Sequence, residues 1–83
     1  MKLMITVNDY EFKVDVKNIY EEIQGYIESA AAKGKRKIAI CFLDDSFKFS
    51  HIKPIVERLS KNTGLSIHAE GGSIIRPHLY IEF

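Results

Sequence analysis

The sequence is poor in several features that mark particular classes of protein. It has one cysteine, two prolines and no tryptophan in 83 residues. A single cysteine excludes an internal disulfide, so a reducing, cytoplasmic location is expected. No apolar stretch approaches the roughly 20 residues that span a bilayer. Residues 1–9 also lack the apolar core and cleavage site of a signal peptide, so no membrane association is expected.

The chain also lacks an excess of either charge and the common cofactor motifs. Its formal net charge is +1, which argues against bulk electrostatic capture of nucleic acid. Gly71-Gly72 belongs to no phosphate-binding loop, and no cofactor is expected. With 46 % hydrophobic and 28 % charged residues, a chain of this length is expected to form a single globular domain, residues 1–83.

Two hairpins are expected, one at each end of the chain. In residues 2–16 the apolar positions change parity across Asn8-Asp9, which predicts a two-residue turn pairing Val7 with Tyr10. Between residues 65 and 83 the apolar side chains fall on odd positions. A turn at residues 71–73 would keep that parity and place His68 opposite Arg76, and Ser66 opposite His78.

Two helices and a buried strand are expected between the hairpins. Asn18 is a predicted helix cap, with Glu21 completing a capping box, and Gly34 follows the helix. A second helix is expected over roughly residues 51–62, with Ser50 as its cap. Residues 38–43 contain no polar side chain, which is typical of an interior strand. Phe47 and Phe49, in the connection that follows, are expected to plug the edge of the core.

These elements predict an α/β (α+β) two-layer sandwich with the order ββαβαββ. Because each helix links two strands, the second, third and fourth strands are expected to be parallel, in a five-stranded mixed sheet. The simplest strand order is 1-2-3-4-5, with both helices on one face. The larger residues of the middle strand, Ile38, Ile40 and Phe42, should face the helices. Ala39, Cys41 and Leu43 would then form an apolar strip on the helix-free face.

The favoured function is a small protein-interaction or regulatory module that binds a partner protein or a second copy of itself. The contact would involve the helix-free sheet face or the edge of the C-terminal strand, where an outer strand can pair with another chain. The candidate binding residues are Ala39, Cys41, Leu43, His68, Arg76, His78 and Tyr80. A zinc site at the two histidines is disfavoured because Arg76 is expected beside them. Cys41 is expected to be an inert thiol within a strand.

Two alternatives remain open from the sequence. The first is nucleic-acid binding, in which His68, Arg76, His78 and Tyr80 would assist a basic cluster of Lys33, Lys35, Arg36 and Lys37. The second is a magnesium-dependent enzyme with Asp44, Asp45 and Glu70 as metal ligands. The simpler interpretation of the first group is a helix end and solvated loop, and that of the two aspartates is a turn.

Overall fold

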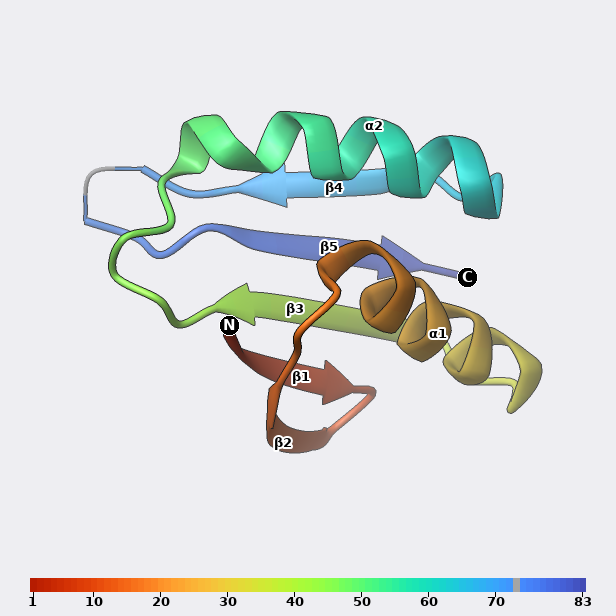
Figure 1. The fold of residues 1–83 in the computed structure, drawn as a ribbon. Helices are drawn as coiled ribbons and strands as arrows, with labels where there is room; N and C mark the ends of the chain where they lie inside the picture. The colour runs from red at the N-terminus through yellow and green to blue at the C-terminus, as the bar shows by residue number, and fades with distance from the viewer. Residues whose placement is uncertain (73) are drawn as a thin grey trace.

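The computed structural model describes residues 1–72 and 74–83, and within them it contains five strands, two α-helices and one short 3₁₀ helix (Figure 1). The strands are β1 (Lys2–Val7), β2 (Tyr10–Asp15), β3 (Lys37–Phe42), β4 (Ile67–Glu70) and β5 (His78–Glu82). The helices are α1 (Ile19–Ala32) and α2 (Ile52–Thr63), and the 3₁₀ helix spans Phe49–His51. The predicted order ββαβαββ and the α+β class are confirmed.

The sheet is antiparallel throughout, with the strand order β2-β1-β3-β5-β4. The predicted chain order and mixed pairing are therefore wrong. The strands β2, β3 and β4 do run in one direction, but β1 separates β2 from β3, and β5 separates β3 from β4 (Figure 1). The connection through α1 passes over β1 on its way from β2 to β3, and the connection through α2 passes over β5 on its way from β3 to β4. The C-terminal strand β5 is consequently interior, and the sheet edges are β2 and β4.

The first hairpin has the predicted register. Val7 pairs with Tyr10 and Leu3 pairs with Val14. Asn8 adopts a positive φ of 52°, which this tight turn requires and which asparagine tolerates. The Asn8 side-chain oxygen also accepts hydrogen bonds from the Arg36 and Lys37 amides, at 3.0 and 3.3 Å. The turn is thereby joined to the start of β3.

The second hairpin differs from its prediction. Its connecting loop runs over residues 71–77, and His68 lies opposite Tyr80 rather than Arg76. Glu70, and not Ser66, lies opposite His78. Ser73, the last residue of the predicted turn, lies outside the described residues. The longer loop preserves the parity, so the odd-numbered residues of both strands still face the helices.

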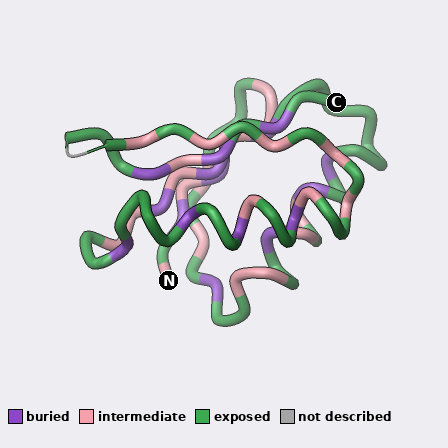
Figure 2. Tube along the Cα trace, turned by 90° about the horizontal axis from the view of Figure 1, so that it is seen from above, coloured by how far each residue is buried: buried purple, intermediate pink, exposed green. Residues whose placement is uncertain are grey.

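Both helices cover one face of the sheet, as predicted, and the core lies between the two layers (Figures 1 and 2). Ile38, Ile40 and Phe42 point into it and are at most 1 % exposed. Phe42 stacks on Phe47, with the ring centroids 4.4 Å apart. Phe47 therefore closes the core as expected, whereas Phe49 is 42 % exposed and does not.

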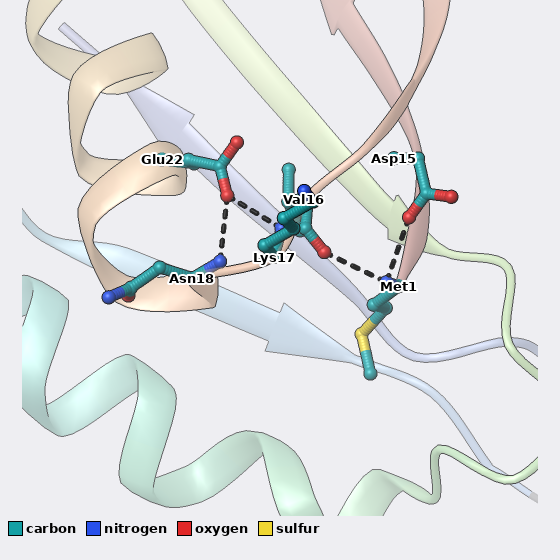
Figure 3. A network of polar contacts seen from close by, with 6 residues as sticks. All are labelled: Met1, Asp15, Val16, Lys17, Asn18 and Glu22. Atoms are coloured by element: carbon teal, nitrogen blue, oxygen red, sulfur yellow. Dashed lines mark hydrogen bonds and ion pairs between the residues drawn. The ribbon is translucent and has the colours of Figure 1, made fainter.

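Side-chain contacts fix the start of the first helix. Asn18 caps α1, since its side-chain oxygen accepts a 3.2 Å hydrogen bond from the Glu21 amide. The carboxylate that reaches back is that of Glu22, not Glu21 as predicted, and it accepts hydrogen bonds from the Lys17 and Asn18 amides at 2.7 Å each (Figure 3). The reciprocal half of the capping box is therefore made one residue later than expected.

The start of α2 also departs from prediction. Ser50 belongs to the 3₁₀ helix and is not the helix cap. The helix ends at Gly64, whose φ of 71° is the left-handed conformation that glycine adopts without strain. Among the described residues, neither helix is long and apolar enough to cross a bilayer.

Candidate interaction surface

The strand register arranges the side chains of the helix-free face in rows that run across the sheet. Side chains on a strand alternate between its faces, so partners in register share a face. One row contains, in spatial order, Lys13, Met4, Cys41, His78 and Glu70. The next row contains Glu11, Thr6, Ala39, Tyr80 and His68. We call these ten side chains, together with Leu43 just beyond β3, the open face.

The predicted apolar strip lies at the centre of the open face and extends along β3. Ala39 and Cys41 are half-buried, and Leu43 continues the strip just beyond the strand. Met4 flanks Cys41 on one side, and His78 flanks it on the other. The structure thus brings the strip together with the predicted His68, His78 and Tyr80, although the strand order differs. Charged residues occupy both margins.

The strip is in close cross-strand contact with β5. The Phe42 amide donates to the Pro77 carbonyl at 3.0 Å, which makes this a hydrogen-bonded pair of the antiparallel ladder. Hydrogen-bonded and non-hydrogen-bonded pairs alternate, so Cys41–His78 and Ala39–Tyr80 are non-hydrogen-bonded pairs. Side chains lie closest in such pairs. Sequence reasoning missed the Cys41–His78 contact because only the strand order reveals it.

Cys41 and His78 do not form an activated nucleophile. Burial raises the pKa of the Cys41 thiol, and the positive charge of Arg76 only partly opposes this. The thiol is therefore protonated at neutral pH, and a protonated thiol is a poor nucleophile. The His78 ring packs edge-to-face on Tyr80, with the centroids 5.2 Å apart. Its Nδ1 atom is buried and has no hydrogen-bond partner among the described residues.

The other predicted histidine, His68, contacts the carboxylate of Glu70 on the same strand. His68 Nε2 lies 3.1 Å from Glu70 Oε1, and both side chains are mostly exposed. Within residues 1–72 and 74–83, no group of three or more His, Cys, Asp or Glu side chains is placed to hold a metal ion. In the strand register His68 lies opposite Tyr80 and His78 lies opposite Glu70, so the two histidines are diagonal to each other.

Arg76 anchors the 71–77 loop to the end of β3. Its guanidinium donates to the Leu43 carbonyl at 2.7 Å and pairs with Asp45 at 2.8 Å. It was predicted to lie opposite His68. The longer loop instead places it at the end of the strip, where its charge is balanced by Asp45.

The three carboxylates of the predicted magnesium site are engaged separately. Asp44 accepts hydrogen bonds from the Ser46 hydroxyl and amide, at 2.7 and 3.0 Å, and these bonds lower the pKa of its carboxyl. Asp45 pairs with Arg76, and Glu70 pairs with His68. Since β5 lies between β3 and β4, Glu70 does not adjoin the two aspartates as the predicted order required.

The residues of the basic cluster line different hollows. Lys33 and Lys35 line a groove between β2 and α1. Arg36 and Lys37 line a different hollow with Glu82 near the C-terminus. Of these four, only Lys37 also lines a hollow that includes Ala39 and Tyr80. The four basic residues therefore line separate hollows and not one groove shared with the open face.

Exposed apolar side chains also lie outside the open face. Ile74 and Ile75, in the loop before β5, are 95 % and 56 % exposed. Tyr10, at the start of β2, is 70 % exposed. The sequence pattern placed Ile75 on the dry face of the second hairpin and Tyr10 on the dry face of the first, yet both are exposed. Only the position of β2 at the sheet edge explains why Tyr10 remains uncovered.

No family model, curated protein or solved structure matches this chain, so its candidate functions depend on its own geometry.

Proposed function

We propose that this chain is a small protein-interaction module that binds a partner protein through the open face. One observation carries the proposal, namely that both helices pack on the same side of the sheet. The opposite side then presents a half-buried apolar strip, Ala39, Cys41 and Leu43, in the middle of a polar surface. An apolar centre within a polar rim is the usual anatomy of a protein–protein contact.

The margins of the open face favour a partner of mixed charge. Glu11 and Lys13 lie at the β2 side, and His68 and Glu70 lie at the β4 side. Because both signs are present at the rim, neither a uniformly acidic nor a uniformly basic surface is complementary to it. Tyr80, which is 39 % exposed beside Ala39, offers an aromatic anchor of the kind enriched in binding hot spots.

The two alternative functions draw less support. For nucleic-acid binding, Glu82 lines the same hollow as Arg36 and Lys37, and Lys33 and Lys35 line another. For metal-dependent catalysis, the carboxylates are engaged with separate partners. Titration of labelled single- and double-stranded oligonucleotides at low salt tests the first alternative. Binding that weakens when Lys35, Arg36 and Lys37 are replaced together would favour it over the open face.

The proposal is tested by comparing what wild type and variants capture from a cell lysate. Ala39→Arg places a long charged side chain in the centre of the strip. Glu57→Ala alters an exposed residue of α2 and serves as the control. We expect a partner that wild type and the control retain and that Ala39→Arg loses, at unchanged circular dichroism. If all three capture the same proteins in equal amounts, the open face is not the binding site.

A further inference from the structure

Strand β2 is an edge of the sheet whose outer backbone groups have no partner in the part of the chain that the structure describes. The Val16 amide donates to the Met1 carbonyl at 2.8 Å, which fixes the phase of the β1–β2 ladder. With that phase, Glu11, Lys13 and Asp15 form non-hydrogen-bonded pairs with β1. Their amide and carbonyl groups therefore point outward, toward any strand added at this edge.

The side chains along this edge alternate in charge. Glu11, Lys13 and Asp15 all lie on the helix-free side of β2. If a second copy adds antiparallel with Lys13 opposite Lys13, Glu11 of each copy lies opposite Asp15 of the other. Every charged side chain then faces one of the same sign. If the twofold axis passes instead through Phe12, Glu11 of each copy lies opposite Lys13 of the other. This second register forms two opposite-charge pairs, and cross-strand pairs of this kind are stabilising, although Asp15 then lies opposite Asp9 in the turn of the other copy. An axis through Val14 would also form opposite-charge pairs, between Lys13 and Asp15, so the helix-facing side must decide between the two.

The helix-facing side of β2 favours the axis through Phe12. The Tyr10 ring lies 5.7 Å from the Phe12 ring, which lies 5.9 Å from Tyr26 on α1. This aromatic run lines a groove that opens at the β2 edge, and Tyr10 is 70 % exposed there. With the axis through Phe12, Tyr10 lies opposite Val14 of the other copy, and the two Phe12 side chains are neighbours. Apolar surface that is otherwise uncovered becomes buried.

We propose that two copies of this chain join edge to edge through β2, antiparallel about Phe12, to form one continuous sheet. Each of the two Glu11–Lys13 pairs exchanges two backbone hydrogen bonds, which gives about four across the junction. A twofold axis perpendicular to the sheet leaves both open faces on the same side. The inference does not depend on the proposed function, because the junction uses the outer backbone edge of β2 whereas the partner contact is centred on the strip on β3. The two share only the rim residues Glu11 and Lys13.

Sedimentation velocity of the full chain, from low to high micromolar concentration, tests the proposal. We expect wild type to form dimers as the concentration rises, and Lys13→Glu to raise the dissociation constant at least tenfold, because both charge pairs become repulsive. Glu11→Lys should act likewise. The double variant Glu11→Lys with Lys13→Glu restores opposite charges across the junction and should restore the dimer. Wild type that stays monomeric, or a double variant that stays monomeric, would overturn the proposal.

A variant that removes a backbone donor tests the same junction if a charge variant fails to fold. In Lys13→Pro the lost amide hydrogen points out of the sheet, so the β1–β2 ladder keeps its hydrogen bonds while the junction loses two. We expect a folded monomer by circular dichroism and sedimentation. A Lys13→Pro dimer as tight as wild type would refute the edge contact. Ala39→Arg should dimerise normally, which separates this result from a failure of the open-face proposal.

Discussion

The strand order is tested directly by a disulfide between β3 and β5. In the variant Ala39→Cys with Tyr80→Cys, made in a Cys41→Ala background, the new thiols occupy a non-hydrogen-bonded pair. The Cα atoms of such a pair are about 4.5 Å apart. That separation falls inside the range of about 4.4 to 6.8 Å that disulfides accept. We expect the bond to form under mild oxidation without displacement of either strand.

The expected stabilisation follows from the length of chain that the bond closes. A loop of about 40 residues corresponds to about 4 kcal/mol in the chain-entropy description, and measured bonds often deliver about half of that. We therefore expect the oxidised variant to exceed the stability of its own reduced form by about 2–4 kcal/mol. With a urea dependence of about 1 kcal/mol per molar for a domain of this size, the unfolding midpoint rises by roughly 2–4 M. Comparing oxidised and reduced forms of one variant cancels the cost of losing the Tyr80 ring.

A matched pair of cysteines provides the control. Glu11→Cys with Ala39→Cys, in the same background, lies in the same row of side chains, but Thr6 of β1 stands between the two positions. Two strand spacings amount to about 10 Å, which no disulfide spans. A disulfide in this control pair would require β2 to adjoin β3, as chain order suggests. A disulfide in the control variant, or failure of the Ala39→Cys, Tyr80→Cys variant to oxidise, would refute the observed order.

Three further predictions concern stability and its dependence on pH. Phe42→Ala should lower the free energy of unfolding by about 3–5 kcal/mol in urea because the ring is fully buried against Phe47, and a loss below about 1 kcal/mol would contradict this packing. Gly64→Ala should lower the free energy of unfolding by about 1 kcal/mol because Gly64 has a positive φ. Gly25→Ala, within α1, places a methyl group that meets nothing within 4 Å and should raise it by about 0.5–1 kcal/mol. Changes of the same sign for the two variants in thermal unfolding would contradict these backbone conformations. Because the pKa of Asp44 is lowered in the folded state, its contribution is present above the unfolded pKa and is lost as the pH falls through the folded pKa. In Asp44→Asn the free energy of unfolding should therefore fall less steeply than in wild type as the pH drops below about 4. The same pH dependence in both proteins would show that these hydrogen bonds contribute nothing to stability.

The local elements of this fold follow from the sequence, because each depends on residues close together in the chain. The alternation in residues 2–16 fixes the register of the first hairpin, and the parity switch across Asn8-Asp9 fixes its turn. The same argument assigned the two faces of β3 correctly, since its larger side chains fill the space beneath the helices. Parity alone does not fix the second hairpin. Loops of three and of seven residues keep the same residues on the same face.

The strand order is nonlocal, but the sequence contains a signal for it in the outward-facing residues. On β2 these are Glu11, Lys13 and Asp15, and on the short β4 they include His68 and Glu70. Charged outward positions and short length are typical of edge strands. The outward residues of the interior strands β1 and β3 include Met4, Thr6, Ala39 and Cys41. Weighing charge above chain order would have placed β2 rather than β1 at an edge. It does not separate β4 from β5, because the outward residues of β5 include His78 and Glu82.

Sequence reasoning placed most of the candidate residues on one face of the sheet, but it predicted neither their contacts nor the position of Arg76. The apolar strip and three of its polar neighbours share a face because side-chain parity survives the change in strand order. The contacts of Cys41 with His78, and of Arg76 with Asp45, depend on which strands adjoin and on where the long loop returns. No local pattern in the sequence specifies either of these.

The interior position of β5 also constrains how a nascent chain acquires this structure during synthesis. The segment that forms β4 leaves the ribosome before β5, yet its hydrogen-bonding partner in the sheet is β5. Until residues 78–82 emerge, β4 and α2 have no strand through which to join the β2-β1-β3 half of the sheet. The β2-β1-β3 half can therefore assemble early, whereas the long-range closure of the sheet waits for β5, and one edge of β3 stays unpaired until then.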